Sequence, residues 1–169
     1  MPTSPRVLSV VLLIFGALFL LASCTTSGPQ HHKTPQAAKG EALYLVSCAA
    51  CHQANGQGLE GIAPPLAGTR WASEPEERLA RIVLHGLRGP ITVADKEYNL
   101  EMPAMGFFNN QDIAAILTYI QAAWGKSARP VTPEVISKIR AQTSERTDSW
   151  TVEELLDAPL PKRSSGQDG

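Results

Sequence analysis

The chain of 169 residues is poor in cysteine, in aromatic side chains and in net charge. It has 3 cysteines, and 6% of its residues are aromatic. The formal net charge of -1 indicates neither a nucleic-acid partner nor binding to an acidic membrane surface. The sequence also lacks internal repeats and any convincing alternation of apolar and polar residues. It therefore predicts an all-α domain without a sheet.

The chain has no apolar run of the length expected for a membrane-spanning helix. Residues 7–22 are apolar apart from Ser9, which is fewer than the roughly 18 residues that such a helix needs. Because Arg6 precedes this run and small residues end it, residues 1–23 are predicted to be a secretory signal peptide. The alternative is an uncleaved anchor helix, and either would export the rest of the chain.

The end of this segment, LASC at residues 21–24, resembles the processing box of bacterial lipoproteins. The resemblance implies that cleavage leaves Cys24 as a lipidated first residue. Lipidation would also account for the one cysteine left over from the pair further along the chain. Residues 24–34 contain Gly, Pro, Ser and Thr, and we expect them to be a flexible tether between a membrane and the domain.

Three main helices are expected within the domain. The first covers residues 35–48 and has Thr34 as its cap. The second, up to residue 85, begins at a predicted capping box formed by Ser73 and Glu76. The third covers residues 109–124, where apolar side chains recur at helical spacing. Loops rich in Gly and Pro connect them.

Residues 129–169 differ in composition from the domain before them. Short helices are expected after Thr132 and Thr151, and the last residues are predicted to be disordered. About forty residues with few apolar groups are not expected to fold alone. This C-terminal extension should lie against the domain or serve as a docking tail.

The segment SCAACHQ places Cys48, Cys51 and His52 in a C-x-x-C-H pattern. A structural zinc site would need a fourth ligand and normally a second pair, which the sequence does not supply. A redox-active C-x-x-C normally follows a strand, whereas a helix is expected here. The third interpretation is covalent haem attachment, in which Cys48 and Cys51 form thioethers and His52 binds the iron. We favour this interpretation over the other two.

Residues 35–128 resemble class I cytochromes c. Gly40 and Tyr44 lie eight and four residues before Cys48, where the family has a small residue and an aromatic one. That pair marks the crossing of the first and last helices, and Tyr119 with Ile116 suits the partner side. The resemblance implies a cytochrome c fold, with about three main helices around one covalently attached haem c.

The segment APPLAG after the attachment loop also resembles this family. By this resemblance, the backbone carbonyl of Pro64 accepts a hydrogen bond from the imidazole of His52, and Leu66 packs against the haem. Tyr98, Trp71 and Arg88 are candidates for hydrogen bonds to the haem propionates, although each can equally be a rim residue.

The sixth iron ligand is expected from the loop NLEMPAMGFF. In the family a Met-Pro pair supplies the thioether, which implies Met102, since Pro103 follows it. Met105 is the second choice and is otherwise expected to pack in the haem pocket. His85 is a rival ligand, but it ends a predicted helix, where a histidine more often interacts with the helix dipole and solvent.

Two ligands of this kind leave no open position on the iron, which predicts one-electron transfer and no enzymatic activity. The alternative is a haem protein with an open or labile distal site that acts as a peroxidase or gas sensor. The stretch at residues 85–105 further resembles small lipoprotein cytochromes that accompany periplasmic quinoprotein dehydrogenases. This implies a periplasmic dehydrogenase as donor, and a respiratory oxidase or another cytochrome as acceptor, on the periplasmic side of a bacterial membrane.

Overall fold

The computed structural model describes residues 34–127 and 129–160. The predicted signal peptide, Cys24, nearly all of the tether and the chain from residue 161 lie outside these residues.

Helix α2 (Pro35–Ser47) begins where the sequence predicts. The hydroxyl of Thr34 accepts a hydrogen bond of 3.2 Å from the backbone N–H of Ala37, and Pro35, which has no N–H to leave unpaired, follows the cap. The short helix α3 (Ala49–His52) comes directly after it. The attachment motif therefore sits where one helix ends and the next turn begins.

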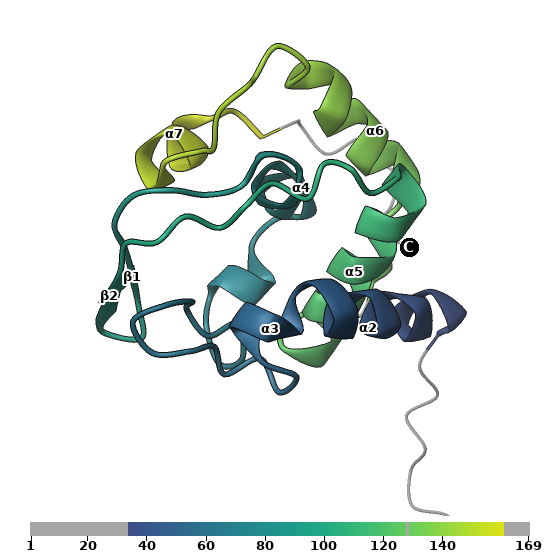
Figure 1. Cartoon of the computed structure of the whole chain (residues 1–169). Helices are drawn as coiled ribbons and strands as arrows, with labels where there is room; N and C mark the ends of the chain where they lie inside the picture. Colours follow the sequence, from purple (N-terminus) through teal and green to yellow (C-terminus); the bar gives the residue numbers. More distant parts are fainter. Residues whose placement is uncertain (1–33, 128, 161–169) are drawn as a thin grey trace, which may run out of the picture. The chain divides into compact units, whose positions relative to one another are not determined.

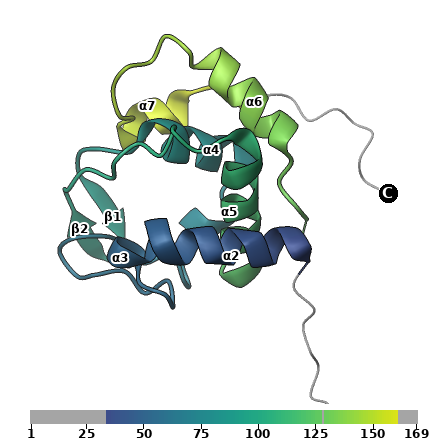
Figure 2. The same cartoon turned by 45° about the vertical axis from the view of Figure 1, so that its right-hand side comes forward.

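Helices α2 and α5 (Asn110–Ala123) pack across each other (Figures 1 and 2). A β-carbon on Gly40 would lie 1.9 Å from the carbonyl oxygen of Ala115, so only glycine allows this approach. One turn later, the buried ring of Tyr44 has its centroid 5.4 Å from that of Tyr119. The predicted crossing at Gly40 is confirmed, and Ile116 lies in the same core cluster.

Helix α4 (Glu76–His85) does not begin with the predicted capping box. Ser73 ends a separate 3-10 helix, η1 (Trp71–Ser73), and Pro75 occupies the N-cap position without a side-chain hydrogen bond. The backbone carbonyl of Pro75 accepts from the N–H groups of Arg78 and Leu79 instead. The capping-box prediction was wrong because the helix starts two residues later than the pattern suggested.

The expectation of no strands was also wrong. Strands β1 (Ile91–Val93) and β2 (Lys96–Tyr98) form an antiparallel hairpin with Ile91 opposite Tyr98. Its two turn residues, Ala94 and Asp95, have φ of 49° and 59°, the left-handed pair that a tight hairpin requires. The pair Ala-Asp is not one of the Asn-Gly or Asp-Gly pairs that usually mark such a turn. Strands of 3 residues are also too short to show an alternation of apolar and polar residues.

The C-terminal extension lies against the domain. Helix α6 (Pro133–Gln142) packs on α4 and α5, and helix α7 (Val152–Asp157) follows it (Figure 2). Thr151 caps α7 with the predicted capping box to Glu154. Thr132 stands at the N-cap of α6 but makes no capping hydrogen bond, which differs from the prediction.

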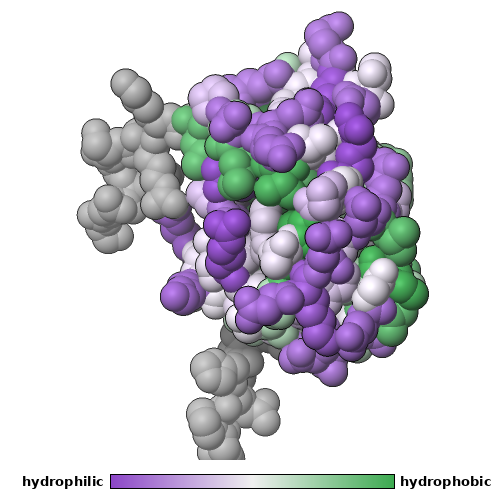
Figure 3. Space-filling view, turned by 90° about the vertical axis from the view of Figure 1, so that its left-hand side faces the viewer, coloured by the Kyte–Doolittle hydropathy of each residue, from purple (hydrophilic) through white to green (hydrophobic). Residues whose placement is uncertain are grey.

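Two clusters of buried apolar side chains form the core. The larger joins α2, α4, α5 and α6, and includes the fully buried residues Ile113, Leu117 and Ile136. The smaller gathers Trp71 and Trp150 with the hairpin and α7. The face shown in Figure 3 is mostly hydrophilic, interrupted by a few apolar areas. Within the part of the chain that the structure describes, no helix is both long and apolar enough to cross a membrane.

Candidate functional site

The attachment motif is held by backbone hydrogen bonds around the end of α2. The N–H of Cys48 donates to the carbonyl of Tyr44 at 2.8 Å, and the carbonyl of Cys48 accepts from the N–H groups of Cys51 and His52 at 3.1 and 2.9 Å. Neither Cys48 nor Cys51 forms a disulfide; Cys48 is half-buried and Cys51 is exposed. As a thiol, Cys48 has its pKa raised to about 11, mainly by burial and less by nearby Cys51.

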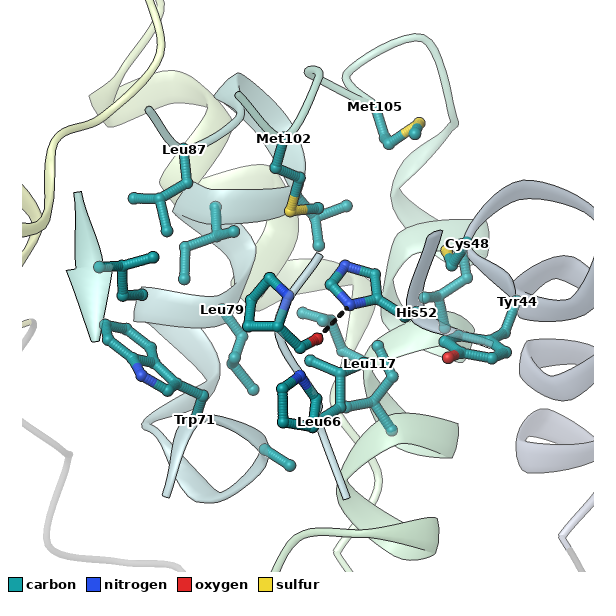
Figure 4. Close-up of a pocket in the computed structure, with 18 of the residues that line it drawn as sticks. Tyr44, Cys48, His52, Leu66, Trp71, Leu79, Leu87, Met102, Met105 and Leu117 are labelled. Carbon is teal, nitrogen blue, oxygen red and sulfur yellow. Dashed lines mark hydrogen bonds between the residues drawn. The ribbon is translucent and has the colours of Figure 1, made fainter. Parts of the chain in front are cut away.

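The imidazole of His52 is oriented by one hydrogen bond. Its Nδ1–H donates to the carbonyl oxygen of Pro64 at 3.0 Å, as predicted (Figure 4). Burial lowers the pKa of His52, and the hydrogen bond to Pro64 opposes this more weakly. A neutral imidazole with its proton on Nδ1 leaves Nε2 as a free electron-pair donor. In Figure 4 this second nitrogen faces the side of the cavity where Met102 lies.

His52 borders a cavity of about 830 Å³, a volume that includes its opening to solvent. The lining is almost entirely apolar and comes from the end of α2, the segment after the attachment motif, η1, α4, the loop and strand after α4, α5, and residues 99–108, here called the methionine loop. It comprises Tyr44, Cys48, His52, Pro64, Pro65, Leu66, Trp71, Ala72, Leu79, Ile82, Val83, Leu87, Ile91, Met102, Met105, Phe108, Ile116, Leu117 and Ile120.

Both candidate methionines line this cavity, but their side chains point differently. The sulfur of Met102 points toward the His52 ring, whereas the side chain of Met105 does not (Figure 4). Met102 is fixed by a pair of backbone hydrogen bonds with Leu87, of 2.8 Å from its N–H and 3.1 Å to its carbonyl. The N–H of Met105 donates to the carbonyl of Val83 at 2.8 Å. The geometry therefore favours Met102 as the partner of His52 across the cavity.

The other candidate residues divide into two groups. Leu66, which is expected to pack against the haem, and Trp71, a candidate for a propionate hydrogen bond, both line the cavity. Tyr98 is buried in the smaller core cluster and is not part of the cavity lining. The guanidinium of Arg88 donates to the Ser149 carbonyl and to Asp148, so it engages the C-terminal extension.

His85, the rival ligand, also lies outside the cavity lining. Its Nε2 is 2.7 Å from the hydroxyl of Thr143, in the turn after α6. Burial is the main cause that lowers its pKa, with Arg146 and Arg140 adding to the effect. His85 is thus engaged with the extension, and Met102 remains the candidate that faces His52.

The sequence did not single out several residues that form the cavity wall. Leu87 and Ile91 come from the loop and strand after α4, and Phe108 from the end of the methionine loop. Leu79, Ile82 and Val83 were visible in the sequence as the apolar stripe of α4, but the pattern could not say that the stripe faces a cavity. Tyr44 lines the same cavity, and its hydroxyl donates to the Gln53 carbonyl at 2.7 Å.

Among the described residues, no group of three or more His, Cys, Asp or Glu side chains is arranged to hold a metal ion. The side chains that meet at the cavity are instead one imidazole, one half-buried thiol and two thioethers, in an apolar lining. An imidazole and a thioether are both haem-iron ligands, and an apolar wall suits a macrocycle. The residues present therefore fit a haem group better than a bare metal ion.

Comparison with known proteins identifies the same segment. The family model described as Cytochrome c matches residues 37–124. Cytochrome c-552 of Thermus thermophilus is 40% identical over 114 residues, which cover 62% of this chain and 86% of that protein.

Two further relatives are longer proteins. The gluconate 2-dehydrogenase cytochrome c subunit of Pantoea cypripedii is 34% identical over 108 residues, covering 60% of this chain and 24% of that subunit. The cbb3-type cytochrome c oxidase subunit CcoP of Helicobacter pylori is 32% identical over 99 residues, covering 59% of this chain and 31% of that subunit.

Proposed function

The chain belongs to the cytochrome c family as a class I mono-haem member, and we propose that His52 and Met102 are the axial ligands of its haem iron. The protein is an electron carrier and binds one covalent haem c. We further assign the two thioether bonds to Cys48 and Cys51. When bound, the haem supplies a one-electron ferric/ferrous couple.

The observation that supports this assignment best is the arrangement of His52 and Met102. The Pro64 carbonyl holds His52 with its Nε2 free, and the sulfur of Met102 points toward that ring from another wall of the cavity. The two ligand atoms come from distant parts of the chain, and each is held by backbone hydrogen bonds. This places one nitrogen and one sulfur donor in the same apolar cavity.

The chain's own residues prepare the site for electron transfer. Methionine paired with histidine raises a haem's reduction potential, and an apolar surround disfavours the more charged oxidised state. The hydrogen bond to Pro64 fixes the orientation of His52 and makes its imidazole a better donor. A site with both axial positions filled by side chains leaves no place for a substrate, in agreement with carriage of electrons.

We propose the following location and partners. Residues 1–23 export the chain, and lipidated Cys24 anchors it on the periplasmic side of a bacterial membrane. A periplasmic dehydrogenase reduces it, and an oxidase or another cytochrome oxidises it. Support comes from the LASC segment and from relatives that are subunits of a dehydrogenase and of an oxidase. Such transfer partners usually meet through small, short-lived interfaces.

The assignment is tested by absorption spectroscopy of the ferric protein. Methionine ligation gives a weak long-wavelength band in ferric haem c, and Met102→Ala should abolish it. Met105→Ala is the matched control and should retain the band, because its side chain does not point at His52. Retention of the band in Met102→Ala would refute the choice of ligand. Rapid binding of carbon monoxide by the reduced wild-type protein would instead indicate an open distal site.

A further inference from the structure

The methionine loop is held from outside by one arginine of the C-terminal extension. Arg140, on α6, donates from Nη1 to the Gly106 carbonyl at 2.9 Å and from Nη2 to the Phe108 carbonyl at 2.8 Å. Its Nε donates to the side-chain oxygen of Asn110 at 3.0 Å. All three guanidinium nitrogens thus engage a segment of 5 residues that begins just after Met105.

Few other hydrogen bonds hold this segment in place. Between Met102 and the start of α5 the chain forms turns and irregular structure without a helix or strand. Its backbone links to the neighbouring chain are the pair of bonds between Met102 and Leu87, just after α4, and the single bond from Met105 to Val83 on α4. Segments with few such bonds open locally at a lower free energy than the whole domain unfolds. Arg140 therefore adds three hydrogen bonds to the backbone bonds and apolar packing that hold the loop.

The extension also contacts the segment after α4 that pairs with Met102, and the start of the loop itself. The N–H of Trp150 donates to the Gly86 carbonyl at 3.2 Å, and the Trp150 carbonyl accepts from the N–H of Arg88 at 2.8 Å. The hydroxyl of Ser149 donates to Glu101, the residue before Met102. The loop is thus flanked at residue 101 and again at residues 106–110 by side chains that lie beyond the segment matched to the family.

We propose that Arg140 is a positioning residue that keeps the thioether of Met102 on the haem iron. The proposal rests on the proposed function, because it requires Met102 to be an axial ligand. The guanidinium is a rigid fork of donors, so it fixes two carbonyls at a set separation and orders the loop backbone. Its charge strengthens each of these hydrogen bonds. The extension, in this view, controls how often the distal position opens.

The direct test is the Arg140→Gln variant of the haem-loaded protein. Carbon monoxide binds the reduced iron only after the methionine leaves, so its binding rate reports loop opening. Loss of one net charge-assisted hydrogen bond corresponds to roughly a tenfold larger open population. We expect the carbon monoxide binding rate to rise about tenfold. Arg140→Lys, which keeps the charge but not the fork, should give an intermediate rate.

Two further measurements separate positioning from a general loss of stability. Hydrogen exchange at the amides of Met102 and Met105 should accelerate in Arg140→Gln, while exchange in the middle of α5 should not. Arg78→Gln is the matched control. Arg78 is also a partly buried arginine, but it pairs with Glu74 at the start of α4, whereas the methionine loop bonds to the end of that helix. This variant should leave the carbon monoxide rate unchanged even if it lowers the unfolding midpoint.

An Arg140→Gln variant with wild-type carbon monoxide binding and an unchanged long-wavelength band overturns the proposal, whatever its unfolding midpoint. An equal rise in the rate for Arg78→Gln also overturns it, because loop opening would then follow overall stability. The failure of the ligand assignment looks different: the band would survive Met102→Ala. If Met102→Ala removes the band but Arg140→Gln binds carbon monoxide at the wild-type rate, the ligand assignment stands and only the positioning role is refuted.

Discussion

Replacing Gly40 by alanine should destabilise the protein by forcing apart the two helices that frame the site. The added β-carbon would lie 1.9 Å from the carbonyl oxygen of Ala115 and 2.5 Å from its carbonyl carbon. Both are backbone atoms, so no side-chain rotation relieves the clash. Restoring an ordinary contact requires a displacement of about 1.5 Å, which is large in a close-packed core.

The net cost can be worked from two opposing effects. Alanine favours a helix by about 1 kcal/mol over glycine. Overpacking typically costs about 1–3 kcal/mol, and more where backbone must move. Because the obstacle here is a neighbouring helix backbone, we expect a net loss of about 2 kcal/mol, equivalent to roughly 8 °C in Tm.

Thermal unfolding of the haem-loaded protein measures this loss. Ala38→Leu is a suitable control because Ala38 is exposed on the same helix, and its effect should stay within about 0.5 kcal/mol. A Gly40→Ala variant as stable as the wild type would refute the argument, because the helices would then have room that the structure denies them.

Two further predictions concern the attachment motif and the histidine that ends α4. Burial is the main cause that lowers the pKa of His85 from 6.5, so the unfolded chain takes up a proton there before the folded chain does. The free energy of unfolding of the haem-loaded protein should therefore fall as the pH drops below about 6.5 and be independent of this group above it. Denaturant unfolding of the wild type and of His85→Gln checks this, because the variant should lose less stability between about pH 6.5 and pH 5; identical profiles would contradict it. Replacing Cys48 and Cys51 together by alanine should leave no haem on the denatured chain by mass spectrometry, whereas Cys24→Ala should keep the haem and lose lipid labelling.

Some of the fold could be predicted because local patterns encode local structure. The starts of α2 and α7 follow from Thr34 and Thr151, whose side chains cap the helices as expected. The capping box at Ser73 was wrong because Pro75 competes for the same helix start, and a pattern of residue types cannot rank the two. The hairpin was missed because Ala94 and Asp95 adopt a left-handed backbone conformation that this pair of residues does not predict.

The candidate site shows the same division. The C-x-x-C-H motif indicated haem attachment from residue types and spacing, and the resemblance to class I cytochromes c implied that the Met-Pro pair supplies an iron ligand. The choice between Met102 and Met105 also had the following proline in its favour, and the direction of the Met102 sulfur supports it. The burial of Tyr98 in the smaller cluster depends on the hairpin, which the sequence did not reveal.

The sequence by itself determined the attachment motif, the main helices and which residues can carry the haem chemistry, because these features depend on neighbours within a few positions. Only the tertiary structure decided that the stripe of α4 faces a cavity and that His85 turns to Thr143. It also decided that Arg140 reaches the carbonyls of Gly106 and Phe108, 34 and 32 residues earlier in the chain. Such distances follow from how whole helices pack, and close packing sums contributions from residues far apart in the sequence.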